Sequence, residues 1–293
     1  MYNMDKLYEA VAERGHVCVG LDTALEYIPE KELKGTDAIF AFNKAIIDST
    51  IDIIACFKVQ IAYYEEMGLA GLNAYSKTLK YIREQGALVI ADIKRGDIAD
   101  TASRYAKAHF EGDFEADFVT LTPFLGMDSI EPWLKWADNK GKGAFVLMRT
   151  SNKGRNDFQC IELGTGRKLY STIGDKVSEL ANSRLGKYGY GPFGVVVGID
   201  AQSEQERKEG ASIRAERSNL FFLIPGYGTQ GGAASDVCLL LREGNGGVVN
   251  ASRSILRAWQ NADEKKDADN ASVGLYARQA VIELRDAILK AAK

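Results

Sequence analysis

The sequence is poor in the residues from which most metal and redox sites are built. Its 293 residues include only two histidines, too few for a histidine-rich metal centre. The cysteines, Cys18, Cys56, Cys160 and Cys238, are widely separated and form no Cys-x-x-Cys pair, so neither a zinc site nor a redox dithiol is indicated. We therefore expect no metal ion and no organic cofactor, and chemistry carried mainly by Lys, Asp, Ser, Thr, Gln or Arg.

The chain also lacks an excess of charge and any long apolar run. Its formal net charge is −3, which gives no general attraction to nucleic acid. No stretch approaches the roughly 18 apolar residues of a membrane span, and the amphipathic start, MYNMDKLYEAVAERG, has no signal-peptide core. Scattered thiols suit a reducing compartment. We expect a cytoplasmic protein that binds neither nucleic acid nor membrane.

What the sequence does contain is a regular alternation of short apolar runs with longer amphipathic stretches. Such runs are typical of parallel strands covered on both faces. Eight alternations, in a chain long enough for a barrel of about 250 residues, predict an α/β fold, a single-domain (β/α)8 TIM barrel over residues 1–293. An open doubly wound sheet is the rival, but no Gly-x-Gly-x-x-Gly follows the first run. The runs are residues 16–22, 53–58, 87–94, 117–122, 143–149, 194–199, 219–224 and 247–251.

Two regions interrupt this alternation. Residues 150–192 are long for one connection and are expected to form a loop plus an extra helix. Residues 259–270 are polar and charged, which is typical of a solvated connection before the last helix. Neither region resembles an interdomain linker, and no internal repeat is present, so one domain is preferred.

Charged residues end three consecutive apolar runs, namely Asp22, Lys58 and the pair Asp92 and Lys94. One such residue often marks only the point where a chain reaches the surface, but barrel active sites lie at this end of the strands. Residues two apart on a strand share a side, so Asp92 and Lys94 should face one site. If Asp97 also lies close to Lys58, Asp92 and Lys94, lysine and aspartate side chains alternate in space. Each carboxylate then favours the protonated form of the lysine ammonium beside it. Such a lysine can protonate a carbanion.

Three further features follow the later runs. The glycine-rich stretch PGYGTQGG, residues 225–232, lets backbone N–H groups approach an anion, although alone it is typical of many turns. Arg253 follows the eighth run, and barrels often bind phosphate in the loops after strands seven and eight. Ser151 lies in the segment Thr-Ser-Asn after the fifth run. Its hydroxyl could form hydrogen bonds with the edge of a heterocyclic ring, or the segment could be an ordinary turn.

Together these motifs resemble orotidine 5′-phosphate decarboxylases in their longer bacterial form, over nearly the whole chain. The similar segments are FK at residues 57–58, DIKRGDI at 92–98, TSN at 150–152, PGYGTQGG at 225–232 and SRSI at 252–255. The resemblance implies conversion of orotidine 5′-monophosphate to UMP and carbon dioxide, the last step of de novo pyrimidine nucleotide biosynthesis. Ser252 departs from the family, where Gly often precedes the arginine, but it still offers a backbone N–H.

The resemblance also implies roles for individual residues. Lys94 would donate a proton to C6 of the pyrimidine, Asp92 would lie against the substrate carboxylate, and Lys58 would join them. The protein would be a homodimer that completes each site across the interface. The remaining implied contacts are Asp22 with the ribose, Asp97 and Thr101 from the partner subunit, Ser151 with the pyrimidine edge, and Gln230 and Arg253 with the 5′-phosphate.

Two alternatives remain open from the sequence. The motif Asp-x-Lys-x-x-Asp is shared with metal-dependent sugar-phosphate decarboxylases of the same superfamily, although Gln230 and Arg253 favour a nucleotide substrate. A non-catalytic barrel that binds a phosphate ligand is the more distant alternative, and a binder gains little from so costly a cluster of charges.

Overall fold

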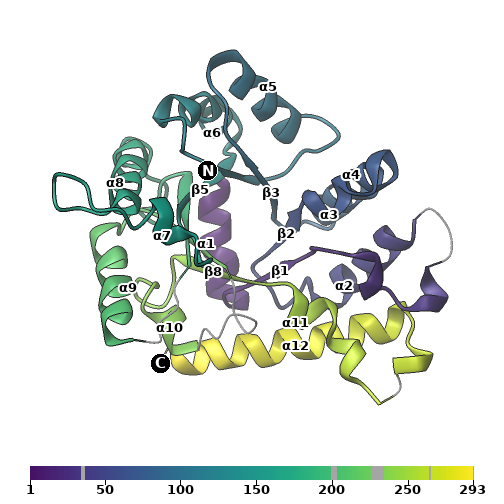
Figure 1. Cartoon of the computed structure of the whole chain (residues 1–293). Coiled ribbons are helices and arrows are strands. Elements are labelled where there is room, and N and C mark those ends of the chain that lie inside the picture. Colours follow the sequence, from purple (N-terminus) through teal and green to yellow (C-terminus); the bar gives the residue numbers. More distant parts are fainter. Residues whose placement is uncertain (34–36, 199–202, 226–233, 264, 293) are drawn as a thin grey trace.

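Parallel strands close into a barrel, as the sequence predicts. The structure is a computed structural model and describes residues 1–33, 37–198, 203–225, 234–263 and 265–292. In this part of the chain each strand pairs in parallel with the next, and the first pairs with the last (Figure 1). The strands are β1 (Val17–Gly20), β2 (Cys56–Gln60), β3 (Val89–Arg95), β4 (Phe118–Leu121), β5 (Gly143–Arg149), β6 (Phe193–Val197), β7 (Phe222–Ile224) and β8 (Gly247–Ala251).

Every expected run overlaps one of these strands, and the fifth and eighth match to the residue. The second run is shifted, because β2 begins at Cys56 and continues to Gln60. Ile53 and Ile54 are buried without belonging to the strand, so their apolar character reflects packing of the preceding turn. Consequently Lys58 lies inside β2 rather than at its end.

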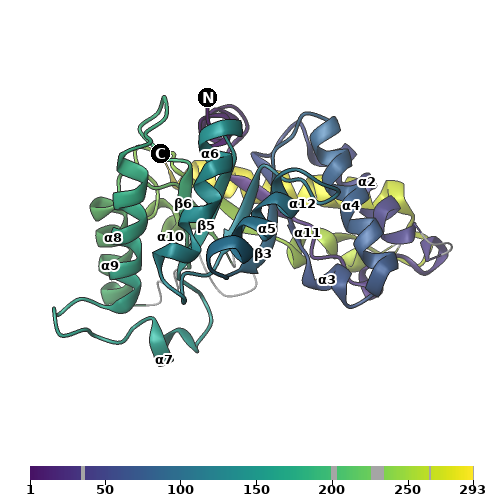
Figure 2. The same cartoon turned by 90° about the horizontal axis from the view of Figure 1, so that it is seen from above.

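Helices surround the barrel, and the long last helix packs along the second (Figures 1 and 2). The helices are α1 (Asn3–Arg14), α2 (Ala38–Thr50), α3 (Ala62–Glu65), α4 (Gly68–Glu84), α5 (Ala99–Phe110), α6 (Leu134–Lys140), α7 (Arg155–Phe158), α8 (Leu169–Asn182), α9 (Glu204–Glu216), α10 (Ala234–Cys238), α11 (Arg253–Leu256) and α12 (Asn270–Ala291), with short 3-10 helices at Leu25–Tyr27, Glu30–Glu32, Met127–Ser129, Glu131–Trp133, Ala258–Asn261 and Lys265–Asp267. No described helix meets the length and hydropathy needed to cross a bilayer.

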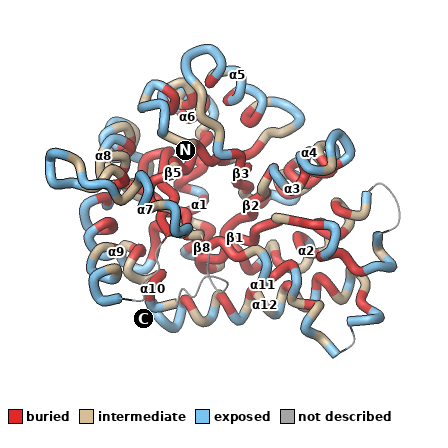
Figure 3. Tube along the Cα trace, in the orientation of Figure 1, coloured by how far each residue is buried: buried red, intermediate tan, exposed pale blue. Residues whose placement is uncertain are grey.

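The helix α1 closes the N-terminal end of the barrel. Its apolar residues Met4, Leu7 and Val11 pack with side chains from the barrel interior, including Phe118 and Phe145. A larger apolar cluster fills the space between the strands and the surrounding helices. Figure 3 shows the result as a buried centre with exposed outer helix faces. Because one end is plugged, the open end for ligands is the C-terminal end of the strands.

The long segment after β5 consists of a short helix, an antiparallel pair and the barrel helix α8. After α7 the backbone folds back on itself, with the Tyr170 N–H donating to the Gln159 carbonyl at 2.9 Å and Leu163 N–H to Arg167 at 2.8 Å. Figure 2 shows α7 on the side of the barrel opposite the N-terminus. Residues 150–168 are therefore the extension proper, and α8 is an ordinary barrel helix.

Candidate active site

Lysine and aspartate side chains meet at the C-terminal end of β1, β2 and β3. Lys58 Nζ lies 3.0 Å from Asp22 Oδ1 and 3.0 Å from Asp92 Oδ2. Lys94 Nζ lies 2.7 Å from the other Asp92 oxygen, Oδ1. Lys58 and Asp92 are buried, whereas the Lys94 side chain is 47% exposed. A buried carboxylate thus holds one buried and one accessible ammonium.

The contact between Asp92 and Lys94 depends on an irregularity in β3. Ala91 pairs with Val119 but Arg95 pairs with Leu121, so β3 has two extra residues and bulges. Lys94 has a φ of 44°, which regular strands do not adopt. The prediction that these side chains meet is therefore confirmed, but simple strand alternation is not the reason.

Thr120, inside β4, supports this bulge. Its Oγ1 accepts the backbone N–H groups of Ile93 and Lys94, each at 3.0 Å. The same hydroxyl donates its proton to Asp92 Oδ1 at 2.8 Å. One hydroxyl supplies one donor and two acceptor lone pairs, so all of its capacity is used here.

The electrostatics fix the charge states of the two buried groups. Burial by itself lowers the pKa of the Lys58 ammonium, but the Asp22 and Asp92 carboxylates outweigh it and hold that pKa above its ordinary value. Burial likewise works to raise the pKa of Asp92, but Lys58 and Lys94 hold it well below its ordinary value. The cluster therefore keeps Lys58 cationic and Asp92 anionic at neutral pH.

A cavity of about 230 Å³ lies beside the cluster. Its lining includes the charged residues Lys58, Asp92 and Lys94, and the loop after β5 contributes Ser151. Leu147, Val196 and Leu223 supply apolar surface, and Asn250 of β8 adds an amide. A charged end, an apolar interior and hydrogen-bonding groups suit a flat polar ring that carries a reacting anion.

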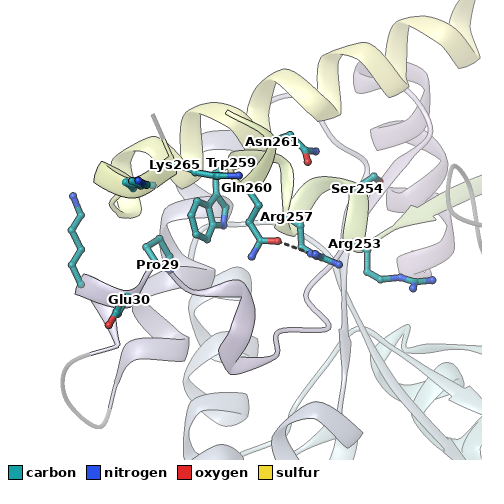
Figure 4. Close-up of a pocket in the computed structure, with 12 residues that line it drawn as sticks. Pro29, Glu30, Arg253, Ser254, Arg257, Trp259, Gln260, Asn261 and Lys265 are labelled. Atoms are coloured by element: carbon teal, nitrogen blue, oxygen red, sulfur yellow. Dashed lines mark hydrogen bonds between the residues drawn. The ribbon is translucent and has the colours of Figure 1, made fainter. Parts of the chain in front are cut away.

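Arg253, the expected phosphate ligand, lies at a different cavity. It begins α11 and lines an open cavity of about 900 Å³ together with Arg257, Trp259 and Gln260 (Figure 4). Figure 4 shows Arg253 at the opposite end of this cavity from Pro29. The polar segment after α11 is only partly solvated, since Trp259 is buried and its indole N–H donates to the Tyr27 carbonyl at 2.9 Å.

Not every expected residue joins the cluster. Within the described residues of one protomer, Asp97 forms no ion pair with Lys94, and its Oδ1 instead accepts the Ile98 N–H at 2.8 Å. Thr101 is exposed on the first turn of α5. Gln230 and the glycine-rich stretch 226–232 lie outside the described residues.

Sequence reasoning missed two residues of the cluster, Thr120 and Gln60. The Gln60 amide donates to Asp92 Oδ2 at 2.9 Å, so this carboxylate has four side-chain partners. Gln60 could have been found by extending the second run by two residues, to the position on the same side as Lys58. Thr120 carried only the weak signal of a hydroxyl within an apolar run. Among the described residues, no group of three or more His, Cys, Asp and Glu is arranged to hold a metal ion.

A closed parallel barrel with charged side chains and a cavity at the C-terminal ends of its strands is the arrangement of a (β/α)8 barrel enzyme. The chain belongs to the orotidine 5′-phosphate decarboxylase / HUMPS family, whose model matches residues 15–268. This confirms the resemblance on which the sequence was interpreted.

Individual relatives agree with this assignment. An orotidine 5′-phosphate decarboxylase of Clostridium perfringens is 54% identical over 291 residues, covering 98% of both chains. The corresponding protein of Clostridium kluyveri is 54% identical and covers 98% of this chain and 97% of its own. Among solved structures, Leishmania donovani OMP decarboxylase has a TM-score of 0.77 and 32% identity, covering 100% of this chain and 99% of that chain.

Proposed function

We propose that this protein converts orotidine 5′-monophosphate to UMP and carbon dioxide, the last step of de novo pyrimidine nucleotide biosynthesis. The observation that carries the proposal is the Lys58–Asp92–Lys94 cluster in the wall of a cavity suited to a polar ring. Membership in the family and the named relatives support the same reaction.

In the proposed reaction the bond between C6 and the carboxylate carbon breaks, and its electron pair stays on C6. Lys94, the accessible cation of the cluster, stabilises this charge and then donates a proton from Nζ to C6. Carbon dioxide leaves, and the neutral Lys94 recovers a proton from water. Asp92, kept anionic by its cationic neighbours, would lie against the substrate carboxylate and repel it in the ground state.

The remaining contacts would orient the nucleotide. Asp22 and Lys58, which form an ion pair, would bind the ribose hydroxyl groups, and Ser151, which lines the cavity, would bind the pyrimidine edge. Gln230 and Arg253 would hold the 5′-phosphate. Phosphate binding far from C6 can supply energy that organises the reacting end, because binding energy from a remote part of a substrate can be used at its reacting centre.

We further propose a homodimer in which the partner subunit supplies Asp97 and Thr101. Within one protomer Asp97 does not reach the cluster, although it follows the same strand. The apolar side chain of Ile98, the residue after Asp97, is 49% exposed, and Phe124, in the loop after the neighbouring strand β4, is 83% exposed. An apolar surface at this position fits a second copy of the chain, which would bury it and bring Asp97 to Lys94.

The proposed enzyme works in the cytoplasm without a metal ion or organic cofactor. The location rests on thiols that remain unpaired in the described structure, which suits a reducing compartment. The absence of a cofactor rests on the chemistry, because the proton and the stabilising charge both come from Lys94.

The proposal is tested by following the loss of orotidine 5′-monophosphate absorbance with purified protein, with and without EDTA. We expect decay that EDTA leaves unchanged. Lys94→Ala should lower kcat by at least about 10³-fold, since both charge stabilisation and proton donation are lost, while UMP binding stays measurable.

Lys80→Ala, at an exposed position on α4, is the matched control and should retain full activity. No decay with the unaltered protein would reject the proposal in favour of a binding protein. EDTA-sensitive turnover of a sugar phosphate such as 3-keto-gulonate 6-phosphate would favour the metal-dependent alternative.

A further inference from the structure

The loop of residues 150–152 is held in place by residues that do not themselves line the cavity. Gln159 Oε1 accepts the Thr150 N–H at 2.8 Å, and Gln159 Nε2 donates to Thr150 Oγ1 at 2.9 Å. Arg155 Nη1 lies 3.4 Å from the Ser151 carbonyl oxygen. A Cβ added at Gly198 would lie 2.7 Å from the Ser151 nitrogen, so the end of β6 packs directly against the loop.

Arg149, the last residue of β5, anchors the start of this loop. Its side chain is only 2% exposed. One guanidinium nitrogen donates to the Gly198 carbonyl, and Nη2 donates to Glu209 Oε2 at 3.0 Å. The planar guanidinium therefore ties the ends of β5 and β6 to α9, which a flexible ammonium would do less rigidly.

Two glutamates of α9 accept the other hydrogen bonds from the segment after β5. Glu206 and Glu209 are three residues apart and therefore share a helix face. Glu206 Oε1 accepts from Arg155 Nη2 at 2.8 Å. Glu209 Oε1 accepts from Lys168 Nζ and from the Tyr170 hydroxyl, both at 2.6 Å.

These contacts explain how the extension after β5 is attached. Arg155, Gln159 and Lys168 all belong to residues 150–168, and each bonds either to the 150–152 loop or to a glutamate of α9. A connection of this length would otherwise leave the loop free to sample many conformations. Charge-assisted hydrogen bonds with little solvent exposure are the interactions best able to hold it.

We propose that Glu209 and Glu206 are positioning residues that fix Ser151 for recognition of the pyrimidine base. They act through Arg149 and Arg155 and do not themselves touch the substrate. This inference rests on the proposed function, in which Ser151 binds the base. It also gives the extension, residues 150–168, a role. Together with Glu206 and Glu209 the extension forms a brace that strengthens binding of nucleotides with a pyrimidine base.

The test compares Glu209→Gln with the unaltered enzyme, using UMP and ribose 5-phosphate as competitive inhibitors. Ribose 5-phosphate has the sugar and phosphate but no base. We expect UMP binding to weaken about tenfold, because misplacing one binding group by a fraction of an ångström is enough. Ribose 5-phosphate binding should change less than twofold, which general damage to the fold would not produce.

Glu204→Gln is the matched control, because Glu204 is on the same helix but is exposed, and among the described residues its ion pair is with Lys208. It should leave both inhibition constants unchanged. Gln159→Met is a second variant that removes the bonds to Thr150 without leaving a buried charge unpaired, and it should show the same selective loss in smaller measure.

The outcomes separate this inference from the proposed function. If the unaltered protein does not decarboxylate orotidine 5′-monophosphate, the proposed function fails. If it does, and if Glu209→Gln and Gln159→Met bind UMP normally or lose both inhibitors equally, the brace has no positioning role. Should Glu209→Gln not fold, Glu206→Gln takes its place, because Glu206 acts through Arg155, and normal UMP binding in that variant would reject the positioning role.

Discussion

At the scale of single residues, Thr120 shows how much of the site depends on a neutral side chain. Its hydroxyl holds Asp92 on one side and two backbone N–H groups of the β3 bulge on the other. The bulge gives Lys94 its positive φ and thereby the position of its ammonium. Thr120 therefore acts on both charged residues without carrying a charge.

Thr120→Val keeps the shape of the side chain and removes these hydrogen bonds. Buried N–H groups left without a partner cost about 1–3 kcal/mol, so the free energy of unfolding should fall by that amount. We also expect kcat to fall at least about tenfold, because Lys94 loses its fixed placement. Urea unfolding and steady-state kinetics on the same samples measure the two effects.

Thr50→Val is the appropriate comparison, since Thr50 is also buried but, within the part of the chain that the structure describes, its hydroxyl bonds to a helix carbonyl, that of Ile46. It should cost less stability and leave kcat unchanged. Unchanged kcat in Thr120→Val would show that the bulge holds Lys94 without this hydroxyl.

The sequence indicated the charged residues of the cluster but not the geometry that joins them. Asp92 and Lys94 stand out because charged side chains within an apolar run are costly unless paired. The bulge could not be predicted, because it is defined by the register of β3 against β4 rather than by either strand alone. Gln60 was missed for a related reason. Ile53 and Ile54 are apolar because they pack in the preceding turn, so the expected strand was placed too early in the chain and ended before Gln60.

At the scale of elements, the last turn of α5 places a histidine, His109, against the barrel. His109 is buried there, stacks on Phe114 and lies near Arg95, which ends β3. Burial, assisted by the charge of Arg95, lowers the pKa of His109 to about 4. The same helix begins at Ala99, two residues after Asp97, so the packing of α5 against the barrel affects the position of Asp97.

This pKa predicts how stability depends on pH. The unfolded chain protonates His109 near its ordinary pKa of 6.5, whereas the folded chain keeps it neutral down to about 4. The unfolded state therefore binds the extra proton, and stability is lost as pH falls from 6.5 to 4. The loss from this group is at most about 3 kcal/mol. His109→Phe should flatten the dependence in that window, as measured by urea unfolding.

Above pH 7 the two proteins should show parallel curves, because His109 is neutral in both states there. A slope between pH 6.5 and 4 that is unchanged by His109→Phe would assign the acid sensitivity to other groups. Asp92, whose pKa is depressed, stabilises the fold above its ordinary pKa of 3.8 and loses that effect only at lower pH.

The extension after β5 shows where prediction at the scale of elements stops. Its length and its glycines indicated a loop with an extra helix, and α7 is present. Its attachment to α9 depends on contacts between residues about 40 to 50 positions apart, which no local pattern records.

At the scale of the whole molecule, the barrel could be predicted because its signal is repeated. Each of eight runs alone is ambiguous, but eight in alternation with amphipathic stretches leave few architectures. The assembly could not be read in this way, because an interface leaves no periodic pattern. The proposed interface rests instead on Asp97, which follows the cluster in sequence yet forms no ion pair with it among the described residues.

The proposed homodimer predicts that two inactive variants restore each other. Lys94→Ala and Asp97→Asn should each be inactive or nearly so. If Asp97 comes from the partner, a mixed dimer contains one site with both changes and one site with neither. Random exchange makes half the dimers mixed, so about a quarter of all sites should become active, as expected for a two-fold interface. Differently tagged subunits allow the mixed dimer to be isolated and assayed.

Pairing Lys94→Ala with Asp92→Asn provides the matched control. These residues belong to the same protomer's cluster, so every site in the mixed dimer remains defective and no activity should return. Activity that returns with Asp97→Asn but not with Asp92→Asn requires two different arrangements. Lys94 and Asp92 of one site then come from the same protomer, whereas Lys94 and Asp97 of one site come from different protomers. A purified mixed dimer that stays inactive in both pairings would place Asp97 outside the site, and the exposed apolar residues beside it would then need another partner.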